Sequence, residues 1–213
     1  MIHVLICDDH VIVRQGIKQI LADAPDIALA GEAGNGPEAV ARVRAGGIDV
    51  LLLDIAMPQR DGLDVLKQLK TEFPRLAVLM LSTYPDRQYA VRSLKLGAAG
   101  YLNKSADSEQ MIDAIRTVAR GKHFITPSVA EQLASAVGAG AHEDKPLHER
   151  LSHREYQVFR LLAAGKSVGE IAEQLVLSPN TVSTYRARIL EKTGVRNDVE
   201  LALFAVRLEL QQV

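Results

Sequence analysis

Residues 50–54 read Val50-Leu-Leu-Leu-Asp54, a short aliphatic run that ends in an acid. Such a run is too brief for a helix, and its uninterrupted apolar character is typical of a strand buried on both faces. Four similar runs occur elsewhere in the first half of the chain, at 4–7, 27–30, 78–81 and 99–102. Patterns of helical period separate them, for example Val13, Ile17, Ile20 and Leu21. This alternation predicts an α/β fold, a flavodoxin-like doubly wound sheet of five parallel strands.

The composition fits an ordinary globular protein. The chain has 213 residues, enough for one or two domains with their own cores, and 47% hydrophobic residues, too many for a disordered chain. The aliphatic runs are much shorter than the roughly 18 residues that cross a bilayer, so we expect no membrane span. A strand-like run follows Met1 at once, which predicts no secretory signal. Cys7 has no second cysteine to pair with, and we therefore expect a cytoplasmic protein.

The second half of the chain has a different pattern. Residues 128–150 are rich in small and polar residues, as linkers are, which predicts domains at 1–127 and 151–213. After this linker every signal is helical, and four short helices are expected. Their ends are marked by Ser152 and Glu155 at capping-box spacing, by Ser178-Pro179, and by Gly194. The last helix has an apolar face that is either a dimer contact or part of the domain's core: Val199, Leu203, Val206 and Leu210.

Polar residues follow four of the predicted strands directly. Asp8 and Asp9 follow the first, Asp54 the third, Ser82 the fourth and Lys104 the fifth. The carboxyl ends of parallel strands share one edge of the sheet, so we expect these side chains to meet there. Carboxylates suit Mg²⁺, and the set suits phosphoryl transfer, with Asp54 as nucleophile and Lys104 and Ser82 holding phosphoryl oxygens. Singly, each could be an ordinary polar residue at a loop start.

Longer motifs around these residues resemble the receiver domain of two-component response regulators. The resemblance covers residues 1 to about 121 and rests on Asp8-Asp9, Asp54-Ile-Ala-Met-Pro-Gln-Arg-Asp-Gly62, Leu81-Ser82 and Gly100-Tyr-Leu-Asn-Lys104. It implies that a partner histidine kinase phosphorylates Asp54. It also implies that Asp9, Asp54 and the Ala56 carbonyl bind Mg²⁺ directly, and that Asp8 acts largely through water. Ser82 and Lys104 would contact the phosphoryl group, and Tyr101 would be the aromatic switch residue.

Two positions bear on what such a receiver can do. The family often has proline after the lysine, whereas this chain has Ser105, so a cis peptide bond at Lys104-Ser105 is in doubt. Aspartyl-phosphate hydrolases of the haloacid dehalogenase type, which resemble this fold, carry a second aspartate two residues after the nucleophile. Ala56 occupies that position here, which favours a phosphorylated switch over a phosphatase and predicts that the protein is not an enzyme.

Residues 167–192 have the pattern of a helix-turn-helix. On a wheel of 100° per residue, Val182, Tyr185 and Ile189 share one side of the second helix, which leaves the other side free. The free side and helix start bear candidate DNA contacts. Basic residues outnumber acidic ones between 178 and 197, although the whole chain has a net charge of −1. A solvated helix in a plain bundle would have the same periodicity.

The sequence from 151 to about 213 resembles the LuxR-type DNA-binding domain, through Leu151-Ser-His-Arg-Glu155, Leu177-Ser-Pro-Asn-Thr-Val182 and Ile189-Leu-Glu-Lys-Thr-Gly-Val195. A receiver joined to this domain is the NarL/FixJ architecture of bacterial transcription factors. The likeness implies base contacts by Ser183, Thr184 and Ala187 and backbone contacts by Ser178, Asn180, Thr181, Arg188 and Lys192. It implies a homodimer on double-stranded DNA, promoted by phosphorylation. A transcription factor that needs no phosphorylation, with a receiver-like dimerisation domain, is the alternative.

Overall fold

The computed structural model describes residues 1–57, 61–82, 87–127, 129–131, 151–175 and 177–210. The chain divides into two compact units, Met1–Ala141 and His142–Val213. The predicted linker at 128–150 lies outside the described residues except for 129–131, so its limits stay a prediction. In the part of the chain described, no helix combines the length and the apolar character that crossing a membrane requires.

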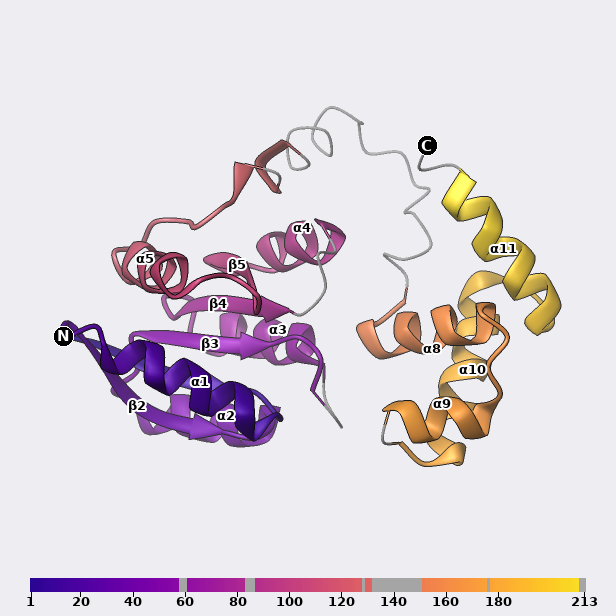
Figure 1. Cartoon of the computed structure of the whole chain (residues 1–213), viewed down its shortest axis with the longest axis horizontal. Helices are drawn as coiled ribbons and strands as arrows, with labels where there is room; N and C mark the ends of the chain where they lie inside the picture. The colour runs from indigo at the N-terminus through magenta and orange to yellow at the C-terminus, as the bar shows by residue number, and fades with distance from the viewer. Residues whose placement is uncertain (58–60, 83–86, 128, 132–150, 176, 211–213) are drawn as a thin grey trace. The chain divides into compact units, whose positions relative to one another are not determined.

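The first unit is built on one parallel sheet (Figure 1). Its strands run in the order β2-β1-β3-β4-β5, and all four neighbouring pairs are parallel. The strands are β1 (Ile2–Cys7), β2 (Ile27–Ala33), β3 (Val50–Asp54), β4 (Ala77–Ser82) and β5 (Gly100–Asn103). The predicted flavodoxin-like fold is confirmed, and each predicted aliphatic run lies within or overlaps one of these strands.

Helices cover both faces of the sheet (Figure 1). They are α1 (Val11–Ala22), α2 (Gly36–Ala45), α3 (Gly62–Glu72), α4 (Arg87–Lys95) and α5 (Ser108–Ala119). One face carries α1 and α5, where Ile17 and Ile115 pack with Val4, Leu52 and Leu81 of the strands in a buried cluster. Since side chains alternate along a strand, the intervening residues face α2, α3 and α4. Burial on both faces explains why the middle of each central strand is a continuous apolar run.

A short segment after α5 extends the sheet at β5. Phe124 forms an isolated parallel bridge with Gly100, and its backbone N–H donates to the Ala99 carbonyl at 2.9 Å. The approach is close, because a Cβ at Gly100 would lie 2.9 Å from the Phe124 carbonyl oxygen. This position therefore requires glycine. The segment that follows α5 is therefore hydrogen-bonded to the residues at the start of β5, the edge strand of the sheet.

The second unit contains the four helices expected. They are α8 (His153–Ala163), α9 (Val168–Leu175), α10 (Pro179–Thr193) and α11 (Asp198–Leu210). Ser152 and Glu155 form a full capping box at α8, Ser178 caps α10, and Gly194 ends α10 with φ of 72°. The helices enclose one core, in which Val158, Ile171, Val182 and Leu201 are buried.

The apolar face predicted for α11 is not part of this core. Val199, Leu203 and Val206 are 71%, 57% and 54% exposed, and the side chain of Leu210 lies outside the described residues. Leu201 is buried instead, with Phe204 and Ala205 packed against the core. The core alternative for that face is therefore wrong. Helical periodicity identifies an apolar face, but α11 has apolar residues on two sides, and periodicity does not tell which of the two sides packs against the core.

Candidate functional site

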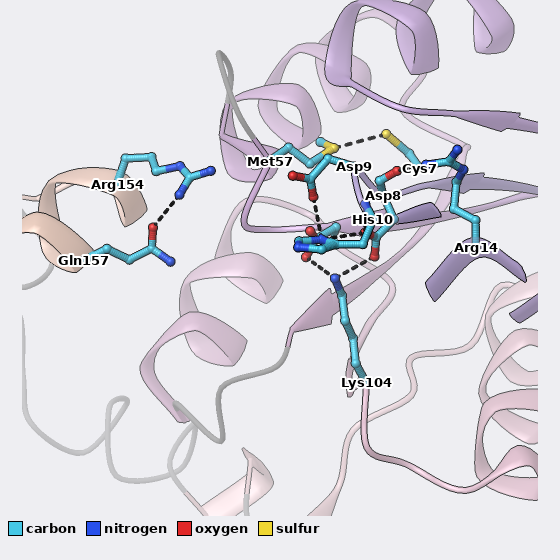
Figure 2. Close-up of polar contacts among 10 residues, drawn as sticks. Cys7, Asp8, Asp9, His10, Arg14, Met57, Lys104, Arg154 and Gln157 are labelled. Carbon is cyan, nitrogen blue, oxygen red and sulfur yellow. Dashed lines mark hydrogen bonds and ion pairs between the residues drawn. The ribbon is translucent and has the colours of Figure 1, made fainter. Parts of the chain in front are cut away.

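Two buried acids and a lysine meet at the carboxyl end of the sheet. Asp8 directly follows β1, Asp54 ends β3, and both side chains are buried. Lys104 follows β5, and its Nζ lies 2.6 Å from Asp8 Oδ2 and 3.0 Å from Asp54 Oδ1. Figure 2 shows the Lys104 side chain directed at the carboxylates. Residues from three strands, almost a hundred positions apart, thus share one site, because parallel strands end at the same edge.

Asp9 and Ala56 complete the predicted metal ligands. One carboxylate oxygen each of Asp8, Asp9 and Asp54, with a ring nitrogen of His10, all lie within 4.8 Å of one another. Burial raises the pKa of Asp54, and the nearby Ala56 backbone N–H works against this rise to a small extent. No residue that the structure describes donates to the Ala56 carbonyl, so this oxygen remains available as a ligand.

The site contains more negative charge than its lysine can neutralise. Asp8 Oδ2 and Asp54 Oδ1 pair with Lys104 Nζ, and Asp9 Oδ1 pairs with the His10 ring, but within the described chain neither these three buried oxygens nor Asp54 Oδ2 has a well-formed hydrogen bond. Burial raises the pKa of Asp54, and Lys104 offsets this only in part, with Asp8 adding to the rise. Burial alone would lower the pKa of Lys104, but the charges of Asp54 and Asp8 outweigh it, and the pKa is raised. Three carboxylates beside one ammonium suit a divalent cation with oxygen ligands, and the residues fit Mg²⁺.

Ser82 and Tyr101 flank this group on the neighbouring strands. Ser82 is the buried last residue of β4, and its carbonyl accepts a hydrogen bond from the Lys104 N–H at 2.7 Å. Tyr101 lies in β5 opposite Met80, and its ring is already buried. The Lys104-Ser105 peptide bond, left open by the sequence, is trans. Ser105 instead donates from its N–H and hydroxyl to Asn103 Oδ1, at 2.8 and 2.6 Å.

Side chains around the acids hold the end of β1 in place. Arg14 of α1 donates from Nη1 to the Asp8 carbonyl at 2.7 Å and pairs with Glu32 at 3.1 Å. Beneath the site, the Cys7 thiol lies 3.3 Å from the Met57 sulfur (Figure 2). Burial raises the pKa of Cys7 to about 12, as expected for a core thiol.

His10 was not among the predicted site residues. In the structure its Nδ1 lies 2.9 Å from Asp9 Oδ1 and 3.3 Å from Asp8 Oδ1. The signal available in the sequence was adjacency alone, Asp8-Asp9-His10 after a strand, and adjacency does not fix where a ring points.

In the second unit, α9 and α10 form the predicted helix-turn-helix. Val182 and Ile189 of α10 are buried, whereas Ser183, Thr184, Ala187 and Arg188 are exposed, as is the helix start at Ser178 and Asn180. The Ser178 side chain accepts from the Thr181 N–H at 3.1 Å and so caps α10. The exposed side of α10 therefore lies opposite its packed side, which agrees with the helical wheel.

The basic residues of α10 are not equally available to a ligand. Lys192 Nζ lies 2.6 Å from Oε2 of Glu155, a buried side chain, and Arg186 pairs with Asp198 at 2.8 Å. Arg188 is exposed and has no ion pair with any residue that the structure describes. Of the two basic residues predicted to contact DNA, Lys192 thus already has a partner.

Glu155→Gln should destabilise the second unit. Burial alone would raise the pKa of Glu155, but hydrogen bonds from Lys192 and Ser152 outweigh it and hold the pKa below its ordinary value of 4.5. The ionised form therefore adds stability that is present above pH 4.5 and is lost as the pH falls through the lowered pKa. We expect a loss of about 1–2 kcal/mol at pH 7, shrinking toward acid pH, in amide hydrogen exchange of α8 and α10.

Glu170→Gln is the matched control. Glu170 accepts hydrogen bonds from Ser167, three residues earlier, as Glu155 does from Ser152, but the Glu170 side chain is exposed at the start of α9. Its replacement should cost clearly less. Equal losses for the two variants would mean that capping, and not the contact with Lys192, provides the stability.

Comparison with known proteins supports the predicted family of each unit. The model for the response regulator receiver domain matches residues 4–116, and the model for bacterial regulatory proteins of the luxR family matches residues 149–205. The chain is 40% identical over 207 residues to the response regulator GacA of Pseudomonas aeruginosa strain PAO1, covering 97% of this chain and 96% of the relative. It is 41% identical over 202 residues to the transcriptional regulatory protein UhpA of Escherichia coli strain K12, covering 95% and 96%.

Solved structures with the same two-part architecture are similar to this chain. RcsB of Salmonella typhimurium has a TM-score of 0.60 at 29% identity, covering 97% of this chain and 100% of that one. A structure of two RcsB dimers bound to two parallel DNAs has a TM-score of 0.59 at 29% identity, covering 96% and 98%.

A receiver sheet with buried acids, followed by a LuxR-type helix-turn-helix, defines a two-component response regulator of the DNA-binding, transcription-regulating class. The chain belongs to the NarL/FixJ family of these regulators, as the similarity to GacA over nearly its whole length shows.

Proposed function

We propose that a partner histidine kinase phosphorylates Asp54 in an Mg²⁺-dependent step, and that phosphorylation promotes dimerisation and promoter binding. The observation that carries this proposal is the buried Asp54 carboxylate, 3.0 Å from Lys104 and beside two further acids. Buried charges in a purely structural role are normally paired, whereas here Asp8 and Asp54 share one lysine and a third acid, Asp9, lies beside them. An arrangement with such excess charge costs stability and is expected where a cation and a phosphoryl group bind.

The chemistry follows from the residues present. An Asp54 carboxylate oxygen attacks the phosphorus of the donor, the bond from phosphorus to the kinase histidine breaks, and an aspartyl phosphate forms. Mg²⁺, held by Asp9, Asp54 and the Ala56 carbonyl with Asp8 acting through water, would supply positive charge to the phosphoryl oxygens. Lys104 would donate to a phosphoryl oxygen and keep its contact with Asp8, and the Ser82 hydroxyl would donate to another.

The same residues support a switch and not an enzyme. Ala56 provides no carboxylate to activate water, so the aspartyl phosphate would be long-lived. Phosphorylation would shift an existing equilibrium between two conformations of the first unit. In the favoured conformation Ser82 and Tyr101 are rearranged toward the phosphoryl group, and the surface of α4 and α5 is changed. Because the Tyr101 ring is already buried, this change would be a repacking of an enclosed ring.

The output would be DNA binding through α10. Exposed Ser183, Thr184 and Ala187 would approach base edges, and Ser178, Asn180, Thr181, Arg188 and Lys192 would contact the backbone. Since Lys192 already pairs with Glu155, one subunit should bind a half-site weakly. Val199, Leu203 and Val206 form an exposed apolar stripe on α11, which supports dimerisation with a second copy of the chain. A dimer would bind two half-sites and so bind DNA more tightly. A cytoplasmic, membrane-free setting is proposed with it.

The test is to treat the purified chain with a small phosphodonor and Mg²⁺. We expect a higher mass in sedimentation velocity and tighter binding to sequences selected from random duplex. An unchanged mass with unchanged, tight DNA binding would support the phosphorylation-independent alternative. Continued release of phosphate over many turnovers would support an aspartyl-phosphate phosphatase.

Arg188→Ala should weaken DNA binding and flatten its salt dependence. An arginine that contacts one phosphate releases about one counterion, so the slope of log K against log salt should fall by roughly one unit. Fluorescence anisotropy at several salt concentrations measures this slope. Arg160→Ala, which removes an exposed arginine of α8, is the matched control and should leave the slope unchanged. Equal effects of both variants would indicate that the salt slope depends on the overall charge of the protein and not on a specific contact between Arg188 and a phosphate.

A further inference from the structure

We propose that His10 is a nitrogen ligand of the metal site, so that the site favours a divalent transition-metal ion such as Co²⁺ more strongly than its carboxylates alone would. This inference rests on the metal site of the proposed function and adds one residue to it.

The distances suit coordination of a single ion. His10 Nδ1 lies 2.9 Å from Asp9 Oδ1 and 3.3 Å from Asp8 Oδ1, and the ligand atoms of all four residues lie within 4.8 Å of one another. Around an ion with bonds of about 2.1 Å, adjacent ligands of an octahedron are about 3.0 Å apart and opposite ligands about 4.2 Å. The 2.9 Å between His10 Nδ1 and Asp9 Oδ1 matches two adjacent ligands, whereas the 4.8 Å limit of the whole set is wider than about 4.2 Å, so the four side chains would close slightly around an ion.

The His10 ring contributes neither to the cap of α1 nor to the core. His10 is the N-cap residue of α1, yet its side chain makes no capping hydrogen bond. The ring is 61% exposed, so it contributes little to the core. It is directed at the acids instead (Figure 2).

The backbone holds His10 at the site. Its N–H donates to Asp8 Oδ1 at 2.8 Å, and its carbonyl accepts from the N–H groups of Val13 and Arg14 at 3.1 and 3.2 Å. The Arg14 side chain in turn donates to the Asp8 carbonyl at 2.7 Å. The turn from Asp8 to His10 is therefore fixed at both ends, which places the ring without a large loss of backbone freedom on binding.

The added nitrogen changes which ion is preferred. Asp8 Oδ2, Asp54 Oδ1 and Asp9 Oδ1 have ion pairs with Lys104 and His10 but no well-formed hydrogen bond within the described chain, and oxygen ligands alone suit Mg²⁺. Imidazole binds first-row transition metals much better than it binds Mg²⁺. Carboxylates themselves prefer Co²⁺ to Mg²⁺ to some extent, so the informative quantity is how much the ratio of the two affinities depends on His10.

His3 offers a matched control. Its Nδ1 lies 3.0 Å from Asp49 Oδ2, and the ring is 48% exposed, similar to His10. His3 contacts a single carboxylate near the start of β1, at the opposite end of the sheet from Asp54. A histidine beside one acid should contribute little to binding of a metal ion at the site of Asp54.

The experiment titrates the full-length chain with Co²⁺ and, separately, with Mg²⁺ by calorimetry at pH 8, following the visible absorption of bound Co²⁺. His10→Ala should lower the Co²⁺ affinity about tenfold, change the Mg²⁺ affinity less than about twofold and alter the Co²⁺ spectrum. His3→Ala should change neither affinity. Thermal unfolding of both variants checks that the fold is intact.

Two outcomes would overturn the assignment of His10: an unchanged Co²⁺ affinity in His10→Ala, or equal losses for the two ions. In both cases the wild-type chain still binds metal, and the proposed function stands. If neither ion binds the wild-type chain, the metal site itself fails, and the assignment of His10 fails with it.

Discussion

Asp54→Asn abolishes phosphorylation by a small phosphodonor, a loss that we expect to exceed about a hundredfold, because an amide cannot act as the nucleophile. The change keeps the size of the side chain and removes one of three crowded acids. Since burial raises the pKa of Asp54, the ionised carboxylate disfavours the folded state at neutral pH, and the variant should be at least as stable as the wild type. Intact-mass spectrometry and thermal unfolding measure the two effects.

Asp49→Asn is the control for this experiment. Asp49 lies near the start of β3 and bonds to His3, far along the strand from Asp54, so its replacement should leave phosphorylation intact. Labelling that persists in Asp54→Asn would assign the phosphoacceptor to another residue. Lost labelling together with a lowered melting temperature would instead point to a damaged fold.

Gly62→Ala should unfold or strongly destabilise the first unit. A Cβ at Gly62 would lie 2.0 Å from the Asp54 carbonyl oxygen and 2.9 Å from Ile55 Cα. Both neighbours are backbone atoms at the end of β3, so relief requires moving the strand that carries Asp54. The Gly62 N–H also donates to the Ile55 carbonyl at 3.0 Å, which holds the two segments together. We expect a loss of about 3 kcal/mol or more in urea denaturation.

Gly16→Ala is the matched change for comparison. Gly16 lies inside α1, and a Cβ there would meet no atom within 4 Å. Alanine in place of glycine inside a helix should stabilise the protein by about 0.5–1 kcal/mol. Opposite signs for the two substitutions are the expected result. A Gly62→Ala variant of wild-type stability would show that the loop can shift and would refute the steric argument.

The sheet and the capped helices were predictable because their signals are local. The runs that lie in β1 and β3 are buried on both faces, which makes them continuously apolar. The capping residues Ser152 and Ser178 accept hydrogen bonds from residues three positions further on. The meeting of Asp8, Asp54 and Lys104 followed from one topological rule, that parallel strands end at the same edge.

What the sequence could not provide depends on contacts between distant residues. Glu155 was identified as a capping residue, but the partner of its second role, Lys192, lies 37 positions away. Leu201 and Val199 are both apolar residues of α11, and only the packing of the other helices decides that Leu201 is the buried one. The ring orientation of His10 likewise depends on the turn that the Asp8 side chain stabilises.

The bridge between Gly100 and Phe124 ties the exit of the polypeptide to the strand that carries Tyr101. A displacement of β5 must either carry the residues after α5 with it or strain the hydrogen bond at the Ala99 carbonyl. The residues that follow α5 are therefore tied to the strand next to the edge where Asp8, Asp54 and Lys104 meet.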